Sequence, residues 1–384
     1  MTSEIHGRCD TAFDKLADDL TRNIDSGDEL GASVVVDIDG DTVVDIWGGY
    51  TDSQRSQPWT TDTITNVWSS TKTVTSLAVL VLVDRGLIDV DAPVADYWPE
   101  FAANGKENVR IRHLLSHTSG VSGWQPPFAI EQLYDWPRAS SHLAGQKTWW
   151  EPGTASGYHA INFGQLLGEV VLRVTGRTLP QFVADDIAGP LEADFQIGAR
   201  EADWHRISDV VPPPPLPFNL SELPEDNLTR MTLDSPPLDA ANANTAAWRR
   251  ADLGAVNGHG NARSLARMMS VIARGGTVDN HALLSPATID LIFEQQSDGT
   301  DLVLLTPIRF GTGFALADPS YLTYPFPGRV CFWGGWGGSI VVMDLEHKTT
   351  IAYTMNKMGA GILGSERTET YLQTISESLE KVFD

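Results

Sequence analysis

At residues 67–74 the chain reads V-W-S-S-T-K-T-V, and this stretch places a lysine where a long apolar run is about to begin. Ser69 and Lys72 are three residues apart, so a helix would carry both on one face. A lysine is rarely buried without a partner, because desolvating its charge is costly. Either Lys72 turns outward to solvent while Ser69 only caps a helix, or a site at this point uses both side chains.

The apolar run after this stretch predicts a deeply buried helix. Val74, Leu77, Ala78, Val81 and Leu82 recur at helical spacing, and further apolar residues fill the positions between them. A helix that is apolar almost all round belongs in the interior of a protein. We therefore expect the Ser69–Lys72 pair at the first turn of a core helix.

Strand patterns lie at both ends of the chain. Residues 10–26 predict an amphipathic helix, and residues 32–38 and 42–47 predict two strands joined by the turn sequence D-G-D. The later strands are predicted at 302–305, 311–316, 329–332, 339–343 and 350–353, and a last helix at 366–382. Two strands alone do not make a stable sheet, so we expect the first pair to join the C-terminal strands.

These patterns predict an α/β (α+β) fold with an antiparallel sheet, flanked by helices from both chain ends. At 384 residues the chain exceeds what one core usually holds, so we expect two domains. Residues 1–86 and 291–384 would form a discontinuous α/β domain, and residues 87–290 an inserted, mainly helical domain with long loops. The buried helix would begin at the seam between them, where active sites are common.

Composition limits the partners. With 27 Lys and Arg against 50 Asp and Glu, the net charge is −23, and so acidic a surface repels nucleic acid and anionic membranes. The first residues contain no basic stretch before an apolar core, and no apolar run approaches the length of a membrane span. We therefore expect a cytoplasmic protein. Cys9 and Cys331 are too few for a disulfide framework or a cysteine zinc site.

The pair Ser69 and Lys72 could act as nucleophile and base. At the first turn of a helix a lysine feels the positive end of the helix dipole, and in an enclosed site it also loses hydration. Both effects lower the pKa of the amine, and a neutral amine could take the proton of Ser69. By itself the spacing S-x-x-K is a weak signal and favours the interpretation in which Lys72 faces solvent and Ser69 caps the helix.

Further motifs follow in order along the chain. They are D-I-W-G-G, P-V-A-D-Y-W-P-E-F, H-L-L-S-H-T-S-G at 113–120, W-E-P-G-T-A-S-G-Y-H-A at 150–160, N-G-H-G-N-A-R and W-G-G-W-G-G-S at 333–339. With S-S-T-K, the chain resembles the β-lactamase-like serine hydrolases, and within them the family VIII carboxylesterases, from about residue 8 to about residue 380. The resemblance implies a serine β-lactamase-like fold and the hydrolysis of short-chain esters through a serine acyl-enzyme.

The resemblance also assigns roles. It makes Ser69 the nucleophile, Lys72 its base and Tyr158 the second acid/base group. The oxyanion hole would consist of the backbone N–H groups of Ser69 and Trp336. The expected substrate-binding residues are Trp333, Gly334, Gly335, Trp336 and His159. A phenol beside a cationic amine becomes more acidic, so we expect Lys72 and Tyr158 to share one proton network.

Two departures from the penicillin-recognising pattern bear on the substrate. Trp333 stands where the third motif usually has lysine or histidine, and Ala160 stands where the tyrosine motif usually has asparagine. Both changes remove polar contacts to a β-lactam and favour a compact apolar pocket. A β-lactamase or amidase and an acyltransferase stay open as alternatives, as does a non-enzymatic acyl-binding sensor.

No metal or other cofactor is expected. His113 and His117 lie four residues apart, but the sequence offers neither an acidic partner nor an H-E-x-x-H pattern, so a structural role is expected for this segment. Phosphate-binding and dinucleotide glycine fingerprints are also missing from the sequence. The expected partner is a small-molecule ester, and the chain could also form a homo-oligomer.

Overall fold

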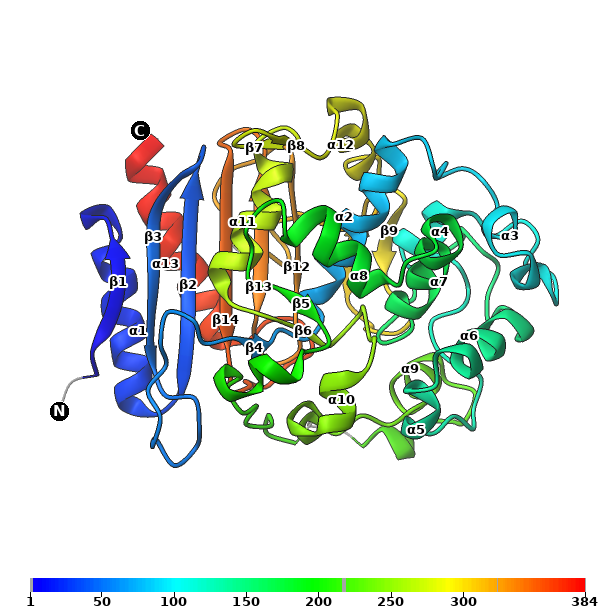
Figure 1. Ribbon diagram of the computed structural model, residues 1–384, viewed down its shortest axis with the longest axis horizontal. Coiled ribbons are helices and arrows are strands. Elements are labelled where there is room, and N and C mark those ends of the chain that lie inside the picture. Colours follow the sequence, from blue (N-terminus) through cyan, green and yellow to red (C-terminus); the bar gives the residue numbers. More distant parts are fainter. Residues whose placement is uncertain (1–2, 216–218, 323, 384) are drawn as a thin grey trace.

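A large antiparallel sheet organises the computed structural model, which describes residues 3–215, 219–322 and 324–383 (Figure 1). From edge to edge its strands follow the order β1-β3-β2-β14-β13-β12-β11-β10-β9. They are β1 (Ile5–Cys9), β2 (Gly31–Ile38), β3 (Asp41–Gly49), β9 (Ser297–Thr300), β10 (Pro307–Phe310), β11 (Ala315–Leu316), β12 (Val330–Gly334), β13 (Ile340–Asp344) and β14 (Thr349–Met355). The short strands β4 (Thr65–Asn66), β5 (Gln196–Ile197), β6 (Gly258–Gly260), β7 (Thr277–Val278) and β8 (His281–Ala282) form two small sheets.

The pairing of β2 with β14 joins the two ends of the chain. Val34 lies opposite Tyr353 and Val36 opposite Ile351 in this antiparallel pair. The prediction that the N-terminal hairpin completes its sheet with C-terminal strands is therefore confirmed. The run of valines in β2 is buried on both faces, because helices cover the sheet from both sides.

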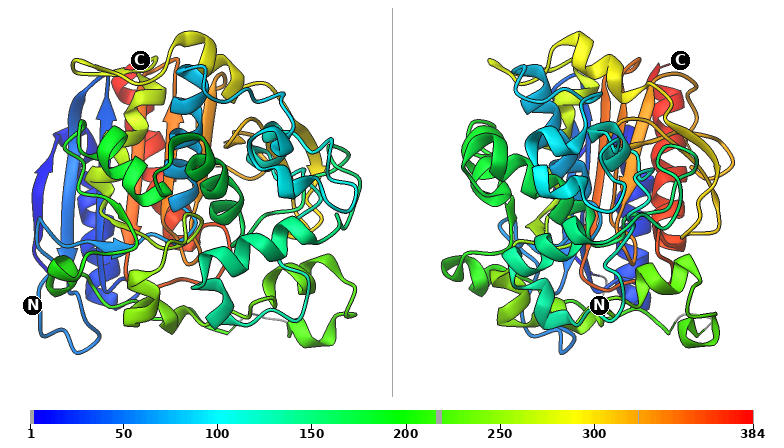
Figure 2. Two further views of the ribbon diagram at one scale, coloured as in Figure 1. Left: turned by 45° about the vertical axis from the view of Figure 1, so that its right-hand side comes forward. Right: turned by 90° about the vertical axis from the view of Figure 1, so that its right-hand side faces the viewer.

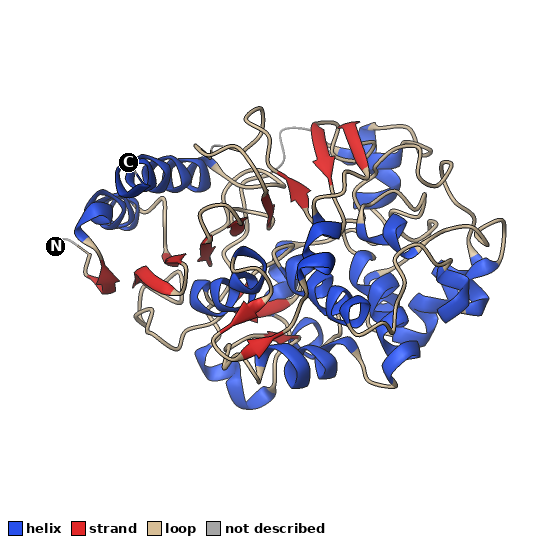
Figure 3. Cartoon of the chain, turned by 90° about the horizontal axis from the view of Figure 1, so that it is seen from above, coloured by secondary structure: helices blue, strands red, loops and turns tan. Residues whose placement is uncertain are grey.

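Helices cover both faces of the sheet and also make up the region beside it (Figure 1). They are α1 (Asp14–Ser26), α2 (Thr71–Asp84), α3 (Val94–Tyr97), α4 (Ile111–Leu115), α5 (Ile130–Leu133), α6 (Trp136–Gly145), α7 (Phe163–Thr175), α8 (Leu179–Val183), α9 (Leu228–Leu233), α10 (Ala246–Arg250), α11 (Ala262–Ala273), α12 (Pro286–Ile292) and α13 (Glu366–Phe383). Figure 2 shows α13 on one face of the sheet and α2 on the other. Seen from above, the chain ends lie near each other, and many of the helices gather at the opposite end of the molecule (Figure 3). No helix among the described residues is long and apolar enough to cross a membrane.

The buried helix predicted after the opening stretch is α2. It packs against β12 of the sheet on one side and against α7 and α8 on the other. The side chains from Thr71 to Leu82 are buried, which is why its apolar residues show no preferred face. The first turn of α2 therefore lies between the sheet and the helical region.

Two strand predictions near the C-terminal part of the chain are wrong in detail. Residues 302–305 form a turn, because the side chain of Asp301 accepts the backbone N–H groups of Val303 and Leu304, which bends the chain. Of the strand predicted at 311–316, only residues 315–316 form a strand, β11, and residues 311–314 form a bend that connects it to β10. Both runs are apolar enough to look like strands but carry local turn chemistry.

The division into two domains stays a prediction. The range 87–290 contains the helices α3 to α10 and most of the long loops, as expected for a helical insertion. It also contains α11, which packs on β2, β13 and β14 of the sheet. By its contacts α11 therefore belongs with the sheet, whichever boundary is drawn in the sequence.

Candidate active site

Three side chains that the sequence analysis singled out converge at the start of α2. The hydroxyl group of Tyr158 donates a hydrogen bond to Ser69 Oγ at 2.8 Å. Lys72 Nζ lies 3.0 Å from the same oxygen atom. All three residues are buried, and Ser69 is the most exposed of them at 7%. Ser69 Oγ therefore lies between an amine and a phenol at the floor of a cavity.

The surroundings of Lys72 favour a neutral amine. Besides Ser69 Oγ, its Nζ atom contacts the backbone oxygen atoms of Ala160 at 2.7 Å and Ala255 at 3.1 Å. Burial lowers the pKa of Lys72 well below its ordinary value. A neutral amine has two N–H groups, which the two carbonyl groups can accept, and one lone pair, which is then free for the Ser69 hydroxyl. Lys72 is thus arranged to take a proton from Ser69.

Tyr158 is less acidic than the sequence analysis expected. Burial raises the pKa of Tyr158 above its ordinary value, although its hydrogen bond to Ser69 acts in the opposite direction. Lys72 Nζ lies only 4.7 Å from the centre of the Tyr158 ring, but a neutral amine supplies no positive charge to stabilise a phenolate. The expected acidification was therefore wrong, and Tyr158 is arranged as a protonated donor.

The backbone around Ser69 offers two free donors. Within the described residues, neither the N–H group of Ser69 nor that of Trp336 donates a hydrogen bond. The end of β12 approaches the Ser69 turn closely, since a Cβ atom on Gly335 would lie 2.6 Å from the carbonyl oxygen of Val67. Trp68, directly before Ser69, has φ = 49°, a conformation that is strained for a bulky side chain. This geometry suits an oxyanion hole built from the two N–H groups.

Two serines fasten the start of β13 to the Ser69 turn, and the sequence motifs do not predict a role in the site for either of them. Ser339 Oγ donates to the carbonyl oxygen of Val67 at 2.8 Å, and it lies 2.9 Å from Ser70 Oγ. Ser70 therefore faces the sheet, whereas Ser69 faces Lys72 and Tyr158. The signal for Ser339 was its place at the end of the third glycine-rich motif.

A small apolar cavity of about 120 Å³ lies over Ser69. Its walls come from the turn before α2, the tyrosine loop, the segment after β12, α9 and several loops. They are formed by Trp68, Ser69, Tyr158, Ala160, Ile161, Leu220, Leu233, Leu238, Val256, Trp336 and Ile362. Trp336 is thus placed to contact a substrate, and the side chain of Trp68 faces its ring at 5.1 Å between ring centres.

His159 lies behind the catalytic phenol, outside this cavity. It is fully buried, its Nε2 atom lies 2.6 Å from Ser119 Oγ, and its Nδ1 atom lies 2.8 Å from the carbonyl oxygen of Gly157. The ring of His117 packs edge-on against that of Tyr158 at 5.1 Å. These histidines support the tyrosine loop from behind. Over the described residues, no group of three His, Cys, Asp or Glu side chains is placed to hold a metal ion.

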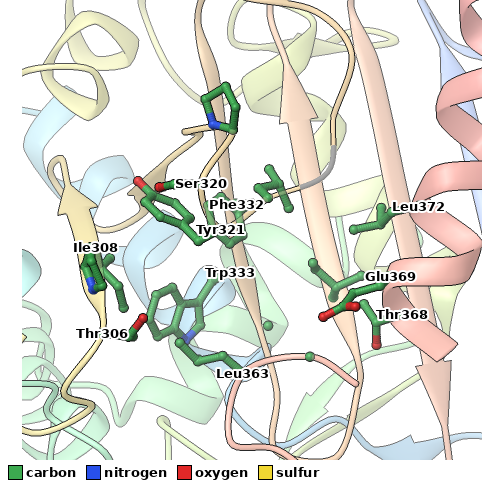
Figure 4. A pocket seen from close by; sticks show the side chains of 16 residues that line it. Thr306, Ile308, Ser320, Tyr321, Phe332, Trp333, Leu363, Thr368, Glu369 and Leu372 are labelled. Carbon is green, nitrogen blue, oxygen red and sulfur yellow. The ribbon is translucent and has the colours of Figure 1, made fainter. Parts of the chain in front are cut away.

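Trp333 and Gly334 line a second cavity of about 430 Å³ (Figure 4). This cavity lies between α13 and the segment 306–322, and Thr306, Tyr321 and Leu363 also face it. The ring of Trp333 lies 5.2 Å from that of Tyr158, so Trp333 stands between the second cavity and the phenol. Gly335 lines neither cavity, and its role is the close approach of β12 to Ser69.

The chain matches the Beta-lactamase family model over residues 13–373 and belongs to this family. It is 32% identical to the esterase/beta-lactamase LipL of Mycobacterium tuberculosis, over 85% of this chain and 77% of that protein. The crystal structure of a family VIII carboxylesterase has 37% sequence identity to this chain and superposes with a TM-score of 0.91. The match covers 98% of this chain and 100% of the chain in that structure. A penicillin-binding protein homologue from Caulobacter crescentus is 34% identical with a TM-score of 0.88, over 98% and 100% of the two chains. The protein is therefore a serine hydrolase of the carboxylic ester hydrolase class.

Proposed function

We propose that this protein hydrolyses short-chain carboxylic esters through an acyl-enzyme on Ser69. The observation that carries the proposal is the position of Ser69 Oγ, 3.0 Å from Lys72 Nζ and 2.8 Å from the Tyr158 hydroxyl group, at the floor of an apolar cavity. A nucleophile within hydrogen-bond reach of a base, and close to an acid, is the arrangement that acyl transfer requires.

In the proposed mechanism the proton of Ser69 passes to Lys72 while Oγ attacks the ester carbonyl. The N–H groups of Ser69 and Trp336 stabilise the negative charge on the carbonyl oxygen. Tyr158 protonates the leaving alkoxide and recovers its proton from Lys72, so both groups return to their starting states. A water molecule then attacks the acyl-enzyme, again with Lys72 and Tyr158 as the proton-transfer groups.

The cavity favours small apolar acyl groups. At about 120 Å³ it has room for a short chain, and each CH₂ group buried against its apolar walls contributes about 0.8 kcal/mol. A β-lactam would have to bury an amide and a carboxylate there. Ala160 has no side-chain amide, and none of the described residues that line this cavity carries a positive charge to pair with the carboxylate. An unpaired buried polar group costs about 1–3 kcal/mol. We expect kcat/KM for p-nitrophenyl butyrate to exceed that for a chromogenic cephalosporin by at least ~10³-fold.

The test combines covalent labelling with an ester panel. An organophosphonate should modify Ser69, as located by mass spectrometry, and Ser69→Ala should abolish both labelling and turnover. Ser70→Ala is the matched control and should keep most of the activity, because Ser70 bonds Ser339 instead of Lys72. Labelling of Ser70 would contradict the assignment, and comparable rates on the cephalosporin would contradict the substrate choice.

The same preparation distinguishes the alternatives. An acyl-binding sensor would give a burst of p-nitrophenol without steady-state turnover. An acyltransferase would give more product ester than free acid when a second alcohol is added. Steady hydrolysis of butyrate esters, with poor rates on long-chain esters, is the result expected here.

A further inference from the structure

Asp301 is a fully buried carboxylate that holds the backbone of Tyr158. The N–H group of Tyr158 donates to Asp301 Oδ1 at 3.0 Å. The same oxygen atom accepts the N–H groups of Val303 and Leu304, each at 2.9 Å. Asp301 has no solvent exposure. One carboxylate oxygen thus fixes the turn at 301–304 and, 143 residues away in the chain, the loop that carries the phenol.

The other oxygen atom of this carboxylate has no partner. Asp301 Oδ2 is buried and accepts no hydrogen bond from any described residue. Such a group is costly, and its desolvation weighs against the stability of the fold. The local turn alone could be capped by a neutral side chain. A charged acceptor makes stronger hydrogen bonds than a neutral one. Asp301 Oδ1 accepts three of them from backbone N–H groups, and one of these groups belongs to Tyr158.

The contacts around Asp301 make a rigid clamp. Leu302 donates its N–H to the carbonyl oxygen of Ser156 at 2.8 Å, two residues before Tyr158. On the other side, Thr229 Oγ1 donates to the carbonyl oxygen of Val303 at 2.8 Å. The segment 301–303 is therefore tied both to the tyrosine loop and to α9, and it cannot shift without moving Tyr158.

We propose that Asp301 is a positioning residue that holds Tyr158 so that its hydroxyl group meets the leaving oxygen of the ester. The inference rests on the proposed function, since it assigns Tyr158 the role of acid. Asp301 touches no reacting atom and acts only through the Tyr158 backbone. A displacement of that loop would lengthen the hydrogen bond between the phenol and Ser69 Oγ.

This role has a consequence that depends on the leaving group. p-Nitrophenolate leaves without protonation, whereas an alkyl alkoxide needs a proton from the acid at the moment of bond cleavage. A misplaced Tyr158 should therefore harm the cleavage of n-butyl butyrate much more than that of p-nitrophenyl butyrate. A loss of folded protein would lower both rates by the same factor.

The experiment measures kcat/KM on both esters for Asp301→Ala and Asp301→Asn, per active site titrated with phosphonate. Asp301→Ala removes all three hydrogen bonds, and we expect it to reduce kcat/KM for n-butyl butyrate at least ~10-fold more than for p-nitrophenyl butyrate. Asp301→Asn keeps an acceptor oxygen and should recover most of the kcat/KM lost on n-butyl butyrate, so its ratio of the two kcat/KM values should return toward that of the wild type. Tyr158→Phe should show the same leaving-group discrimination as Asp301→Ala, and Asp298→Asn, an exposed neighbour in β9, should behave as wild type.

Equal losses on the two esters in Asp301→Ala, or no recovery in Asp301→Asn, would overturn the inference. If Asp301→Ala does not fold, Asp301→Asn decides alone. Its ratio of the two kcat/KM values must then lie between those of the wild type and of Tyr158→Phe. Failure of the proposed function is recognised separately, because wild-type Ser69 would then resist the phosphonate.

Discussion

Protons around Ser69 Oγ are distributed over two groups that depend on each other. Tyr158 donates to this oxygen, so the hydroxyl proton of Ser69 points toward the lone pair of Lys72. Burial disfavours a charge on either partner, which lowers the pKa of Lys72 and raises that of Tyr158. In the resting enzyme the neutral pair is therefore preferred, and proton transfer creates charge only when a substrate is present to be attacked.

Removal of either group should break this proton path. We expect Lys72→Ala and Tyr158→Phe each to lower kcat for p-nitrophenyl butyrate, by at least ~10²-fold for the base and by less for the acid. The double variant should be scarcely slower than Lys72→Ala, because the two groups act as one unit. Losses that multiply in the double variant would show two independent roles.

The pKa of Lys72 should determine how kcat/KM depends on pH. Burial places the pKa of Lys72 well below its ordinary value, so kcat/KM should fall only as the pH drops through this lowered pKa. We expect this acidic limb to be absent from the residual activity of Lys72→Ala, measured on p-nitrophenyl butyrate with phosphonate-titrated protein. An unchanged acidic limb in the variant would assign it to another group.

The sequence predicted the central residues of the site but not their supports. Ser69, Lys72 and Tyr158 were expected together because each sits in a motif with its own spacing, and the structure brings them within hydrogen-bond distance. Asp301 gave no signal, since a lone aspartate in a polar loop is common and its contact spans 143 residues. The acidity of Tyr158 was misjudged because depth of burial cannot be read from spacing.

Among the elements, the close approach of β12 to the first turn of α2 shapes the oxyanion hole. A methyl group on Gly335 would meet Ser339 Oγ at 2.2 Å and the carbonyl oxygen of Val67 at 2.6 Å. Gly335→Ala must therefore push β12 away from Ser69 or rotate the serine. The N–H of Trp336, one residue further on, would move with the strand.

We expect Gly335→Ala to lower kcat by about 10²–10³-fold, the usual cost of losing one oxyanion donor. KM should change little, because the acyl cavity is lined by other side chains. Gly145→Ala is the matched control, since a methyl group there meets no atom within 4 Å. Activity of Gly335→Ala close to wild type would place the oxyanion donor elsewhere.

At this scale the sequence predicted element type better than element ends. The alternation and β-branched residues of β2, β3, β13 and β14 gave these strands within a few residues. The prediction for 302–305 failed, because Asp301 caps this segment as a turn in which Val303 is buried but Leu305 is exposed. Capping by a side chain leaves no period in the sequence, so hydrophobic pattern alone cannot reveal it.

For the whole molecule, a buried ion pair fastens α13 to the beginning of β2. Arg367 Nη1 lies 2.9 Å from Glu29 Oε1, and Tyr353 donates its hydroxyl group to Glu29 Oε2 at 2.6 Å. Burial raises the pKa of Glu29 from 4.5 to about 7, and this effect outweighs the attraction of Arg367. Glu29 therefore binds a proton more tightly in the folded than in the unfolded protein.

This difference predicts a pH-dependent stability. Between about pH 4.5 and 7 the folded state holds the extra proton, so the Glu29 contribution to the free energy of unfolding should decrease as the pH rises through this range and then level off. The decrease amounts to about 3 kcal/mol at ~1.4 kcal/mol per pH unit. Denaturant unfolding of Glu29→Gln at pH 5 and pH 8 should lack this part of the slope, whereas exposed Glu346→Gln should keep it. Parallel slopes in wild type and Glu29→Gln would contradict the shift.

The pairing of β2 with β14 sets an order of events during synthesis. The N-terminal hairpin leaves the ribosome roughly 300 residues before its partner strand, which at about 5–20 residues per second is a wait on the order of 15–60 s. During that interval β2 is paired with β3 on one edge, while its other edge, which later binds β14, has no partner strand. Nascent chains of this protein should therefore depend on holding chaperones until translation ends, and the nucleophile should gain reactivity only after the last strands emerge.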